Sequence, residues 1–434
     1  MNETLYALAT APGRAALAVV RLSGPDSRRV LETLTCRPAP KVRQMQVRQI
    51  HGPDGGRVDE CLVVWFKGPG SFTGEDVVEL HLHGGAAVVA GVTAALEAAG
   101  CRPAGPGDFT RRAFENGRLS LAEAEGIADL IDAETAQQRS QALEQMGGAL
   151  DERFARWRTS LIGVLALLEA AIDFPDEDLP DDVAAGALEA LKALDGELEA
   201  ALGSARGEQV REGFRVALIG QPNAGKSSLF NSLIGREAAI VTPLAGTTRD
   251  VIEADLVLGG YLVRIADTAG LRDTDDIIET EGVRRARAWA DSAALRLWVA
   301  DGTLHVKHLP PSGSQDWWVL TRGDRGAADV TGPYRFRVDA RAPETLTALT
   351  GALRDHVAAT LSGADFPAVT RLRHRQILGE ARTALGRAIG GFGRPPELVG
   401  EDVRLAARAL ERLAGRIGSE DVLDQVFRSF CIGK

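Results

Sequence analysis

A short apolar run followed by a glycine-bounded loop constrains the fold of this chain more than any other feature. Residues 215–219 read as a buried strand, and residues 220–227 follow as Gly-Gln-Pro-Asn-Ala-Gly-Lys-Ser and open a helix. They form a complete G-x-x-x-x-G-K-[ST] motif, whose glycines let the backbone wrap closely around phosphate groups. The loop amides and the helix N-terminus together attract negative charge. The motif therefore predicts a phosphate-binding loop within an α/β sheet.

The pattern of elements along the chain predicts a multidomain protein of the α+β and α/β classes. Residues 1–118 read as an α+β domain, and strands alternate with helices over residues 213–365, which is typical of a mostly parallel sheet. Residues 119–212 and 366–434 are helical, and we expect them to pack together as one discontinuous domain into which the α/β domain is inserted. Residues 303–316 are too short and too rich in proline for the usual helix between two strands, so we expect a loop there.

Composition and charge restrict the partners and the compartment. The 434 residues carry a formal net charge of -10, so an RNA partner would have to meet a local basic patch or a second protein. Cys36, Cys61, Cys101 and Cys431 lie far apart, which argues against a zinc site and a disulfide framework and favours a reducing cytoplasm. The first residues lack the basic region of a signal peptide, and the longest apolar stretch is interrupted by Glu169. We therefore expect no membrane span.

Two residues of the loop and one residue after it would bind phosphates and Mg²⁺. Lys226 would place a point charge at the outer phosphates, and the Ser227 hydroxyl suits Mg²⁺. Residues 245–250 read Ala-Gly-Thr-Thr-Arg-Asp and resemble a switch I segment. Thr248 in that segment offers a second hydroxyl to the metal.

Residues 267–270 read Asp-Thr-Ala-Gly, which is the D-x-x-G pattern of a switch II segment. Residues 251–265 predict a hairpin that turns at Gly259 and Gly260 and leads to Asp267 at the end of a strand. There Asp267 would hold the Mg²⁺ shell, and the amide of Gly270 would sense the γ-phosphate. Together with the switch I segment, this spacing favours a translation-factor-related GTPase over a generic ATPase.

The residue after Gly270 is Leu271, whereas Ras-like enzymes carry a glutamine there that orients the attacking water. One interpretation is a slow or inactive GTPase. The other is that Asn223 binds a monovalent cation beside the phosphates and that Glu279 orients the water. Glu279 would otherwise be an ordinary acidic residue in the first turn of a helix.

The base-reading motif, usually Asn-Lys-x-Asp, here reads Thr-Arg-Gly-Asp at residues 321–324. Asp324 would still accept both guanine N–H groups, and Arg322 would stack on the base. Thr321 lacks the amide that ties the loop together, and residues 339–341 replace a Ser-Ala-Lys-like segment with Asp-Ala-Arg. Losing one or two such hydrogen bonds costs on the order of 1–3 kcal/mol. We therefore expect retained guanine preference with weakened affinity.

Two local patterns mark elements in the first half of the chain. Residues 78–83 alternate as in a half-buried strand, with Val78, Leu80 and Leu82 on one face and Glu79, His81 and His83 on the other. The histidines suggest a metal pair, but no third ligand lies nearby, and the alternative for His83 is an ordinary turn. Ser120 followed by Glu123 is a capping-box signature that predicts a helix start.

These motifs resemble the MnmE (TrmE) family of tRNA-modifying GTPases over essentially the whole chain. The resemblance rests on residues 220–228, 246–250 and 267–272, on Ser-Phe-Thr-Gly-Glu-Asp at residues 71–76, and on Phe-Cys-Ile-Gly-Lys at residues 430–434. It implies an N-terminal α+β domain for folate binding and dimerisation, a discontinuous helical domain and an inserted Ras-like P-loop G domain.

The resemblance also implies an activity. Members of the family are homodimeric, cytoplasmic GTPases that require Mg²⁺ and are activated by K⁺ when their G domains pair. With an MnmG-type FAD-dependent partner they install a (carboxymethyl)aminomethyl group at C5 of the wobble uridine of certain tRNAs. The carbon comes from 5-formyl- or methylene-tetrahydrofolate.

Site residues follow from the resemblance by position. The GTP-binding residues are Asn223, Ala224, Gly225, Lys226, Ser227, Ser228, Thr242, Thr247, Thr248, Asp267, Thr268, Ala269, Gly270, Asp324 and Ala340. Ser227 and Thr248 would bind Mg²⁺, and Asn223, Thr242, Leu244 and Thr247 would bind K⁺. Glu279 would be the catalytic carboxylate. Arg21, Glu79, Arg118 (a lysine in the family pattern) and Lys434 would bind folate, and Cys431 is a candidate for thiolate chemistry.

Two rival functions stay open on the sequence. A ribosome-assembly GTPase switch would share the G motifs, but it would bring a basic RNA-binding module or a second phosphate-binding loop, neither of which the sequence contains. A folate-binding one-carbon protein with a weakened G domain would account for the altered base-reading motif.

Overall fold

The computed structural model describes most of the chain, in two compact units. The described residues are 3–173, 181–235, 239–240, 252–268, 284, 287–302, 315–322, 334–339, 342–392, 394–415, 420–428, 430 and 432–433. The first unit comprises residues 1–128, 145–169 and 400–434, and the second comprises residues 129–144 and 170–399. The predicted loop at 303–316 lies almost wholly outside the described residues.

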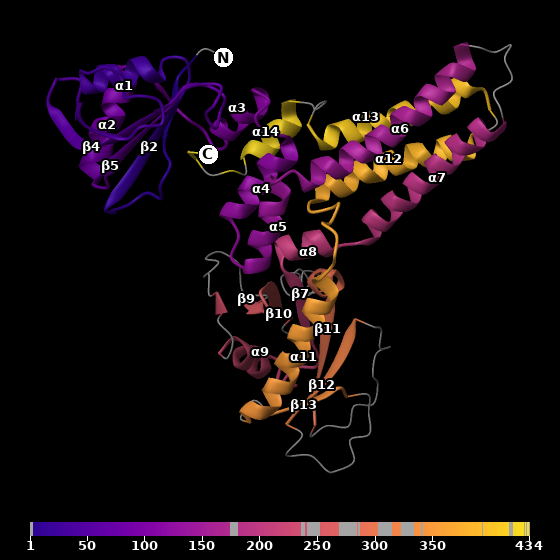
Figure 1. The fold of residues 1–434 in the computed structure, drawn as a ribbon. Helices are drawn as coiled ribbons and strands as arrows, with labels where there is room; N and C mark the ends of the chain where they lie inside the picture. Colours follow the sequence, from indigo (N-terminus) through magenta and orange to yellow (C-terminus); the bar gives the residue numbers. More distant parts are fainter. Residues whose placement is uncertain are drawn as a thin grey trace. The chain divides into compact units, whose positions relative to one another are not determined.

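The first unit contains a six-stranded sheet with two helices packed on it (Figure 1). Its strands are β1 (Leu5–Leu8), β2 (Leu17–Ser23), β3 (Gln46–His51), β4 (Arg57–Phe66), β5 (Val77–His83) and β6 (Arg102–Pro103), in the spatial order β3-β4-β5-β2-β1-β6. The first four helices of the chain are α1 (Ser27–Thr35), α2 (Ala86–Ala98), α3 (Asp108–Glu115) and α4 (Leu121–Ile131). Strand β1 pairs with β6 in parallel, and the other neighbouring strands are antiparallel.

The alternation predicted for residues 78–83 is confirmed in β5. Val78, Leu80 and Leu82 are buried, whereas Glu79 and His81 are partly exposed and His83 is exposed. The buried face packs against α1 and α2, so the polar residues of the same strand lie on the opposite face of the sheet.

The capping box at the start of α4 is also confirmed. The Glu123 amide donates to Ser120 Oγ at 3.0 Å, and the Ser120 amide donates to Glu123 Oε2 at 2.7 Å. These reciprocal bonds satisfy two amide groups that a helix start otherwise leaves unpaired. Leu121 and Ala124 of α4 then pack with Phe427 of the last helix.

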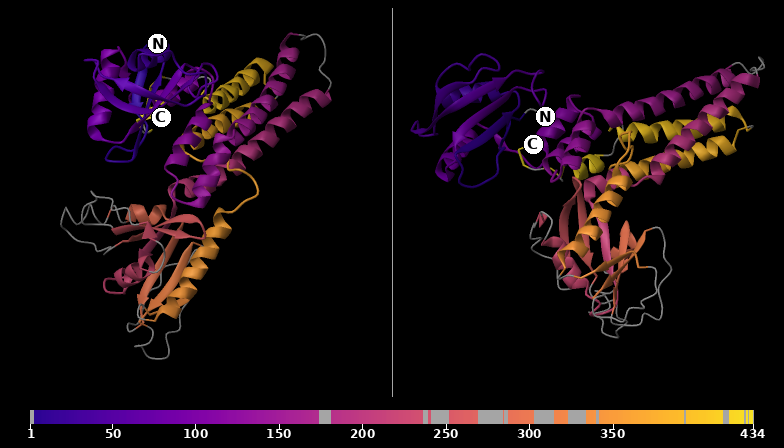
Figure 2. Two further views of the ribbon diagram at one scale, coloured as in Figure 1. Left: turned by 60° about the vertical axis from the view of Figure 1, so that its left-hand side comes forward. Right: turned by 60° about the horizontal axis from the view of Figure 1, so that its bottom comes forward.

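The remaining helices bring distant parts of the sequence together. They are α5 (Ala136–Met146), α6 (Ala149–Asp173), α7 (Asp181–Gly203), α8 (Arg206–Glu212), α12 (Leu372–Gly390), α13 (Pro396–Leu413) and α14 (Glu420–Arg428). In the first unit, Arg158 of α6 pairs with Glu411 of α13 at 2.8 Å. In the second unit, α7 runs alongside α12 (Figure 2), and Arg382 pairs with Asp195 at 3.2 Å.

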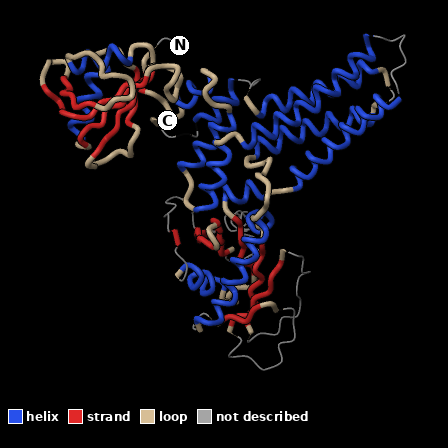
Figure 3. Tube along the Cα trace, viewed as in Figure 1, coloured by secondary structure: helices blue, strands red, loops and turns tan. Residues whose placement is uncertain are grey.

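The second unit also contains a seven-stranded sheet, whose strands appear in red in Figure 3. Its strands are β7 (Phe214–Ile219), β8 (Ala239–Ile240), β9 (Ile252–Leu258), β10 (Tyr261–Asp267), β11 (Leu295–Asp301), β12 (Asp316–Thr321) and β13 (Phe336–Val338), in the order β13-β12-β11-β7-β10-β9-β8. Helices α9 (Lys226–Ile234) and α11 (Pro343–Leu361) pack against it. All pairs from β13 to β10 are parallel.

Strand β7 lies in the middle of this sheet because it is apolar on both faces. Val216, Ala217 and Leu218 are all almost completely buried, as expected for a central parallel strand covered on both sides. The predicted hairpin is confirmed in β9 and β10, which pair antiparallel and turn at Gly259 and Gly260 with positive φ angles of 62° and 86°. Among the described helices, none is both long enough and apolar enough to cross a bilayer.

Candidate functional site

The phosphate-binding loop follows β7 and depends on glycines at two positions. A Cβ on Gly220 would lie 2.2 Å from the carbonyl oxygen of Val299 in β11, so the loop can pass the neighbouring strand only without a side chain. Gly225 has a φ of 92° immediately before α9, and Asn223 has a φ of 62°. These left-handed conformations fold the loop back over the start of the helix.

Lys226 is held inside the loop as a buried cation. Only 6% of the residue is exposed, and its ammonium donates to the carbonyl oxygens of Gly220 at 2.9 Å and Gln221 at 3.0 Å. Burial lowers the pKa of Lys226, and the nearby Asp267 carboxylate opposes part of that shift. Because a buried charge is costly to desolvate, the arrangement favours an anion that completes its surroundings.

Ser227 in the first turn of α9 and Asp267 at the end of β10 come together. The Ser227 hydroxyl donates to Asp267 Oδ2 at 2.6 Å, at the point where β10 ends beside β7. Asp267 is 1% exposed, and its other oxygen, Oδ1, is buried with no hydrogen-bond partner among the described residues. A buried carboxylate oxygen without a donor, beside a hydroxyl, suits the oxygen-ligand chemistry of Mg²⁺. The donor set therefore fits the predicted metal.

Thr268 anchors the start of the predicted switch II segment to the sheet. Its buried hydroxyl donates to the carbonyl oxygen of Leu218 at 2.6 Å. The side chain therefore binds the backbone of β7 in this structure.

Thr321 contradicts one expectation from the sequence. Its hydroxyl lies 2.6 Å from the carbonyl oxygen of Ala224 in the loop and 3.2 Å from that of Ala300 in β11. The prediction that threonine at this position loses the tie to the loop is therefore wrong. A hydroxyl supplies the donor in place of an amide, because β12 brings Thr321 close enough for the shorter side chain to reach.

We expect Thr321→Val to lower the free energy of unfolding by about 1–2 kcal/mol, since it leaves the Ala224 carbonyl without this donor. Valine keeps the shape of threonine, so packing is retained. Urea unfolding measured beside Thr321→Ser, which keeps the hydroxyl, provides the control. A valine variant more stable than the serine variant would show that the tie contributes nothing.

Arg322 follows Thr321 in an unusual backbone conformation. Its φ is 52°, and its guanidinium donates to Asp301 Oδ2 at 2.8 Å. The Arg322 side chain is 46% exposed, whereas that of Asp301 is only 5% exposed. The sequence predicted a role for Arg322 but gave no reason to single out Asp301.

The predicted folate residues of the N-terminal sheet are partly brought together. Arg21 of β2 pairs with Glu79 of β5, with Arg21 Nη2 2.8 Å from Glu79 Oε1. Arg21 Nη1 also donates to the carbonyl oxygen of Gly433 at 3.2 Å. Arg118 lies against Gly74, where a Cβ would be 3.2 Å from Arg118 Cγ. The C-terminal tail is thus brought to Arg21 across the length of the sequence.

The histidines of β5 do not form a joint metal site. His83 lies 2.8 Å from Asp59, and His81 lies 3.4 Å from Glu79. Within the described part of the chain, no three His, Cys, Asp or Glu side chains gather as metal ligands.

The segment at residues 71–76 has a structural role that sequence reasoning missed. Buried Arg112 of α3 donates to Glu75 at 2.7 Å, and Glu75 also accepts from Ser23 at 2.8 Å. Ser23 in turn shares a hydrogen bond with Thr73. Charged groups three-quarters or more buried in this way are normally paired, and no spacing in the sequence identifies Arg112 as the partner.

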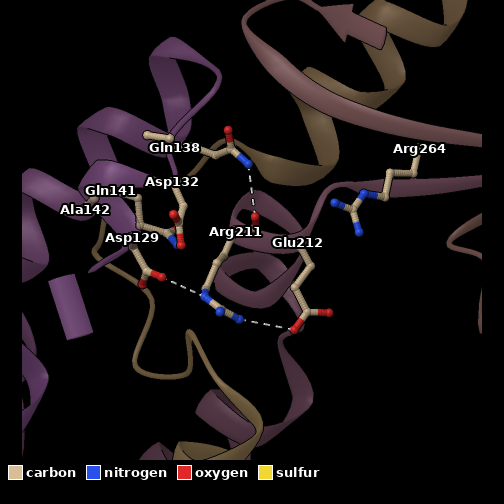
Figure 4. Close-up of a pocket in the computed structure, with 9 residues that line it drawn as sticks. Asp129, Asp132, Gln138, Gln141, Ala142, Arg211, Glu212 and Arg264 are labelled. Atoms are coloured by element: carbon tan, nitrogen blue, oxygen red, sulfur yellow. Dashed lines mark hydrogen bonds and ion pairs between the residues drawn. The ribbon is translucent and has the colours of Figure 1, made fainter. Parts of the chain in front are cut away.

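A polar pocket of about 290 Å³ in the second unit was also not predicted. It is lined by Asp129, Asp132, Ala133, Gln138, Gln141, Ala142, Arg211, Glu212 and Arg264. Figure 4 shows Arg211 between Asp129 and Glu212, with Gln138 donating to the Arg211 carbonyl oxygen at 3.0 Å. None of the predicted site residues lines it.

Several predicted residues cannot be placed. Thr242, Leu244, Thr247, Thr248, Ala269, Gly270, Glu279, Asp324, Ala340, Cys431 and Lys434 lie outside the described residues. Asn223, Ala224 and Gly225 lie in the loop, and Ser228 lies in the first turn of α9.

Two family models match this sequence. The model described as GTP-binding protein TrmE N-terminus matches residues 4–118, and the model described as MnmE helical domain matches residues 121–431.

Curated proteins named tRNA modification GTPase MnmE are similar over their full length. The protein of Caulobacter vibrioides is 56% identical over 452 residues, and that of Phenylobacterium zucineum is 55% identical over 447 residues. That of Maricaulis maris is 49% identical over 440 residues, and all three alignments cover 100% of both chains. The helical-domain model matches more than half of this chain, and the relatives are about half identical to the chain from end to end. The chain therefore belongs to the MnmE family.

Proposed function

We propose that this chain, a GTPase of tRNA modification, is activated by K⁺ and works with an MnmG-type FAD-dependent partner. Together they would install a (carboxymethyl)aminomethyl group at C5 of the wobble uridine of certain tRNAs. The observation that carries the hydrolytic part is the gathering of the buried Lys226 and Asp267 with the exposed Ser227 around one loop. The family's members support the tRNA part.

The loop supplies the groups that GTP hydrolysis needs. The Lys226 ammonium would give up its hydrogen bonds to the Gly220 and Gln221 carbonyls and bind the outer phosphates instead. Ser227, Thr248 and Asp267 would hold Mg²⁺, which when bound neutralises charge on the phosphates. A Ser227 hydroxyl that held the metal would no longer donate to Asp267, so this one hydroxyl would connect the loop to the start of the switch II segment.

Asn223, Thr242, Leu244 and Thr247 would hold K⁺ beside the phosphates, and Glu279 would orient the attacking water. The left-handed conformation of Asn223 places this residue in the bend of the loop. Positive charge there would do the work of an arginine finger.

The one-carbon chemistry belongs to the N-terminal sheet in this proposal. Arg21 and Glu79 on the polar face, with Arg118 and Lys434, would bind 5-formyl- or methylene-tetrahydrofolate in a homodimer, and Cys431 would lie nearby. The Arg21 contact with Gly433 supports a role for the tail, because it brings the last residues to the folate pair.

We propose four segments for these tasks: a folate-binding and dimerisation domain at residues 1–118, a helical domain at 119–212 and 366–434, and the G domain at 213–365. The pairs Arg158–Glu411 and Arg382–Asp195 support the discontinuous helical domain, because each joins a helix before the G domain to one after it. A cytoplasmic location remains a prediction.

GTP turnover in K⁺ and in Na⁺, measured for the wild type and Glu279→Ala, tests the proposal. We expect fast turnover only in K⁺ and a loss of roughly a hundredfold or more in the variant, because general acid–base groups contribute about 10²–10⁴-fold. Glu281→Ala, two residues along, is the matched control and should keep its activity. Equal turnover with both cations and in both variants would leave the rival folate protein with a weakened G domain as the better explanation.

A further inference from the structure

Two buried carboxylates lie between β11 and β12, at opposite ends of the same pair of strands. Asp316 is the first residue of β12 and binds Arg296 through both oxygens, at 2.6 and 3.1 Å. Asp301 is the last residue of β11 and binds Arg322 at 2.8 Å. Both aspartate side chains are 4–5% exposed. Both are aspartate–arginine pairs, and they differ in their place on the sheet; Asp316 also accepts from Trp298 Nε1 at 2.8 Å.

Only the Asp301 pair lies at the ligand-binding edge. In a parallel sheet, ligands bind outside the carboxyl ends of the strands. Asp301 and Thr321 end their strands at the same edge as the loop after β7, and the Thr321 hydroxyl reaches Ala224 in that loop. A Cβ on Gly225 would lie only 3.0 Å from that hydroxyl oxygen, so the loop and the end of β12 fit closely together.

Arg322 has a left-handed backbone conformation, and its guanidinium is bound by Asp301. A left-handed φ is uncommon for a residue with a long side chain. The guanidinium is planar and stacks on flat rings, which the ammonium of lysine does not do. Asp301 binds one nitrogen of the guanidinium, and 46% of the Arg322 side chain is exposed at the end of β12.

We propose that Asp301 is a positioning residue for the nucleotide base. It holds the Arg322 guanidinium at the edge of the sheet so that its flat face stacks on the purine of the bound nucleotide. Asp301 itself does not touch the nucleotide, and the phosphates are bound independently by the loop. This inference rests on the proposed function, since it takes the ligand of the loop to be a guanine nucleotide.

A double-mutant cycle on nucleotide binding tests the inference. We expect Asp301→Asn and Arg322→Ala each to raise the Kd of a fluorescent GDP about five- to tenfold, in the range of cation–ring interactions. The double variant should bind no more weakly than Arg322→Ala alone, because the two residues act as one unit. Competition by inorganic tripolyphosphate, which has no base, should be unchanged in every variant.

Asp316→Asn is the matched control, because it removes an equally buried carboxylate from the same strands at the far end. It should lower the melting temperature while leaving the Kd for GDP unchanged. Arg322→Lys keeps the charge and its pairing with Asp301 and restores the residue that is usual in this motif, so it should bind GDP more tightly than Arg322→Ala. This exposed position also keeps the test available if Asp301→Asn does not fold.

Three outcomes would overturn the inference: a wild-type Kd in Asp301→Asn, a wild-type Kd in Arg322→Ala, or additive effects in the double variant. An effect of the same size on tripolyphosphate would also overturn it, because the residue would then act on the loop. A wild-type protein that binds no guanine nucleotide would instead refute the proposed function.

Discussion

Asp129→Ala is expected to lower the free energy of unfolding of the second unit by about 3 kcal/mol, at the lower end for breaking a buried ion pair. The Asp129 carboxylate accepts from Arg211 at 2.8 Å and from Arg371 at 2.6 Å. The Asp129 side chain is 12% exposed, and the side chains of Arg211 and Arg371 are 30% and 16% exposed. Without it, two guanidinium groups would face each other with little water to screen them.

The position of these residues makes the effect large. Arg211 lies just before β7, where the chain enters the sheet, and Arg371 lies just before α12, where the chain has left it. One carboxylate thus binds both connections of the α/β segment. Removing this carboxylate would therefore loosen both connections at once.

Urea unfolding of Asp129→Ala beside Asp132→Ala measures this effect. Asp132 lines the same pocket but is exposed, so its removal should change stability by less than about 0.5 kcal/mol. If the two variants unfolded at the same urea concentration, Asp129 would have no special role in holding the two connections.

Lys226→Met is expected to raise the Kd for GTP about a hundredfold, because hydrogen bonds to charged groups contribute roughly 1.5–3 kcal/mol each. The wild-type ammonium is buried and ready to leave two backbone carbonyls for phosphate oxygens. Methionine fills the same space without a charge, so the loop keeps its packing.

Calorimetric titration with GTP, together with a melting curve without nucleotide, separates binding from folding. The variant should melt near the wild type, since the cost of burying the ammonium offsets the two hydrogen bonds that it loses. A Kd within threefold of the wild type would mean that the phosphates bind elsewhere.

Local patterns in the sequence were sufficient for the elements that carry the site. The loop after β7, the hairpin at Gly259 and Gly260, the alternation in β5 and the capping box at Ser120 all depend on residues close together in the chain. Backbone conformation, side-chain period and capping bonds are decided over a few residues, so they can be read directly from the sequence.

The partners of the polar side chains were not predictable in this way. Thr321 bonds to Ala224, Arg21 to Gly433, and Asp129 to both Arg211 and Arg371, across separations of tens to hundreds of residues. For Thr321 the sequence even led to the wrong expectation, because a missing amide says nothing about how close a hydroxyl comes.

The sequence by itself therefore determined the phosphate-binding loop, the strand that leads into it and the buried faces around it. Only the tertiary structure decided which donor meets which acceptor, and so which residues hold the loop and the two connections of the α/β segment in place. The physical reason is that a hydrogen bond or ion pair depends on positions to within a fraction of an ångström, and the packing of whole elements sets those positions.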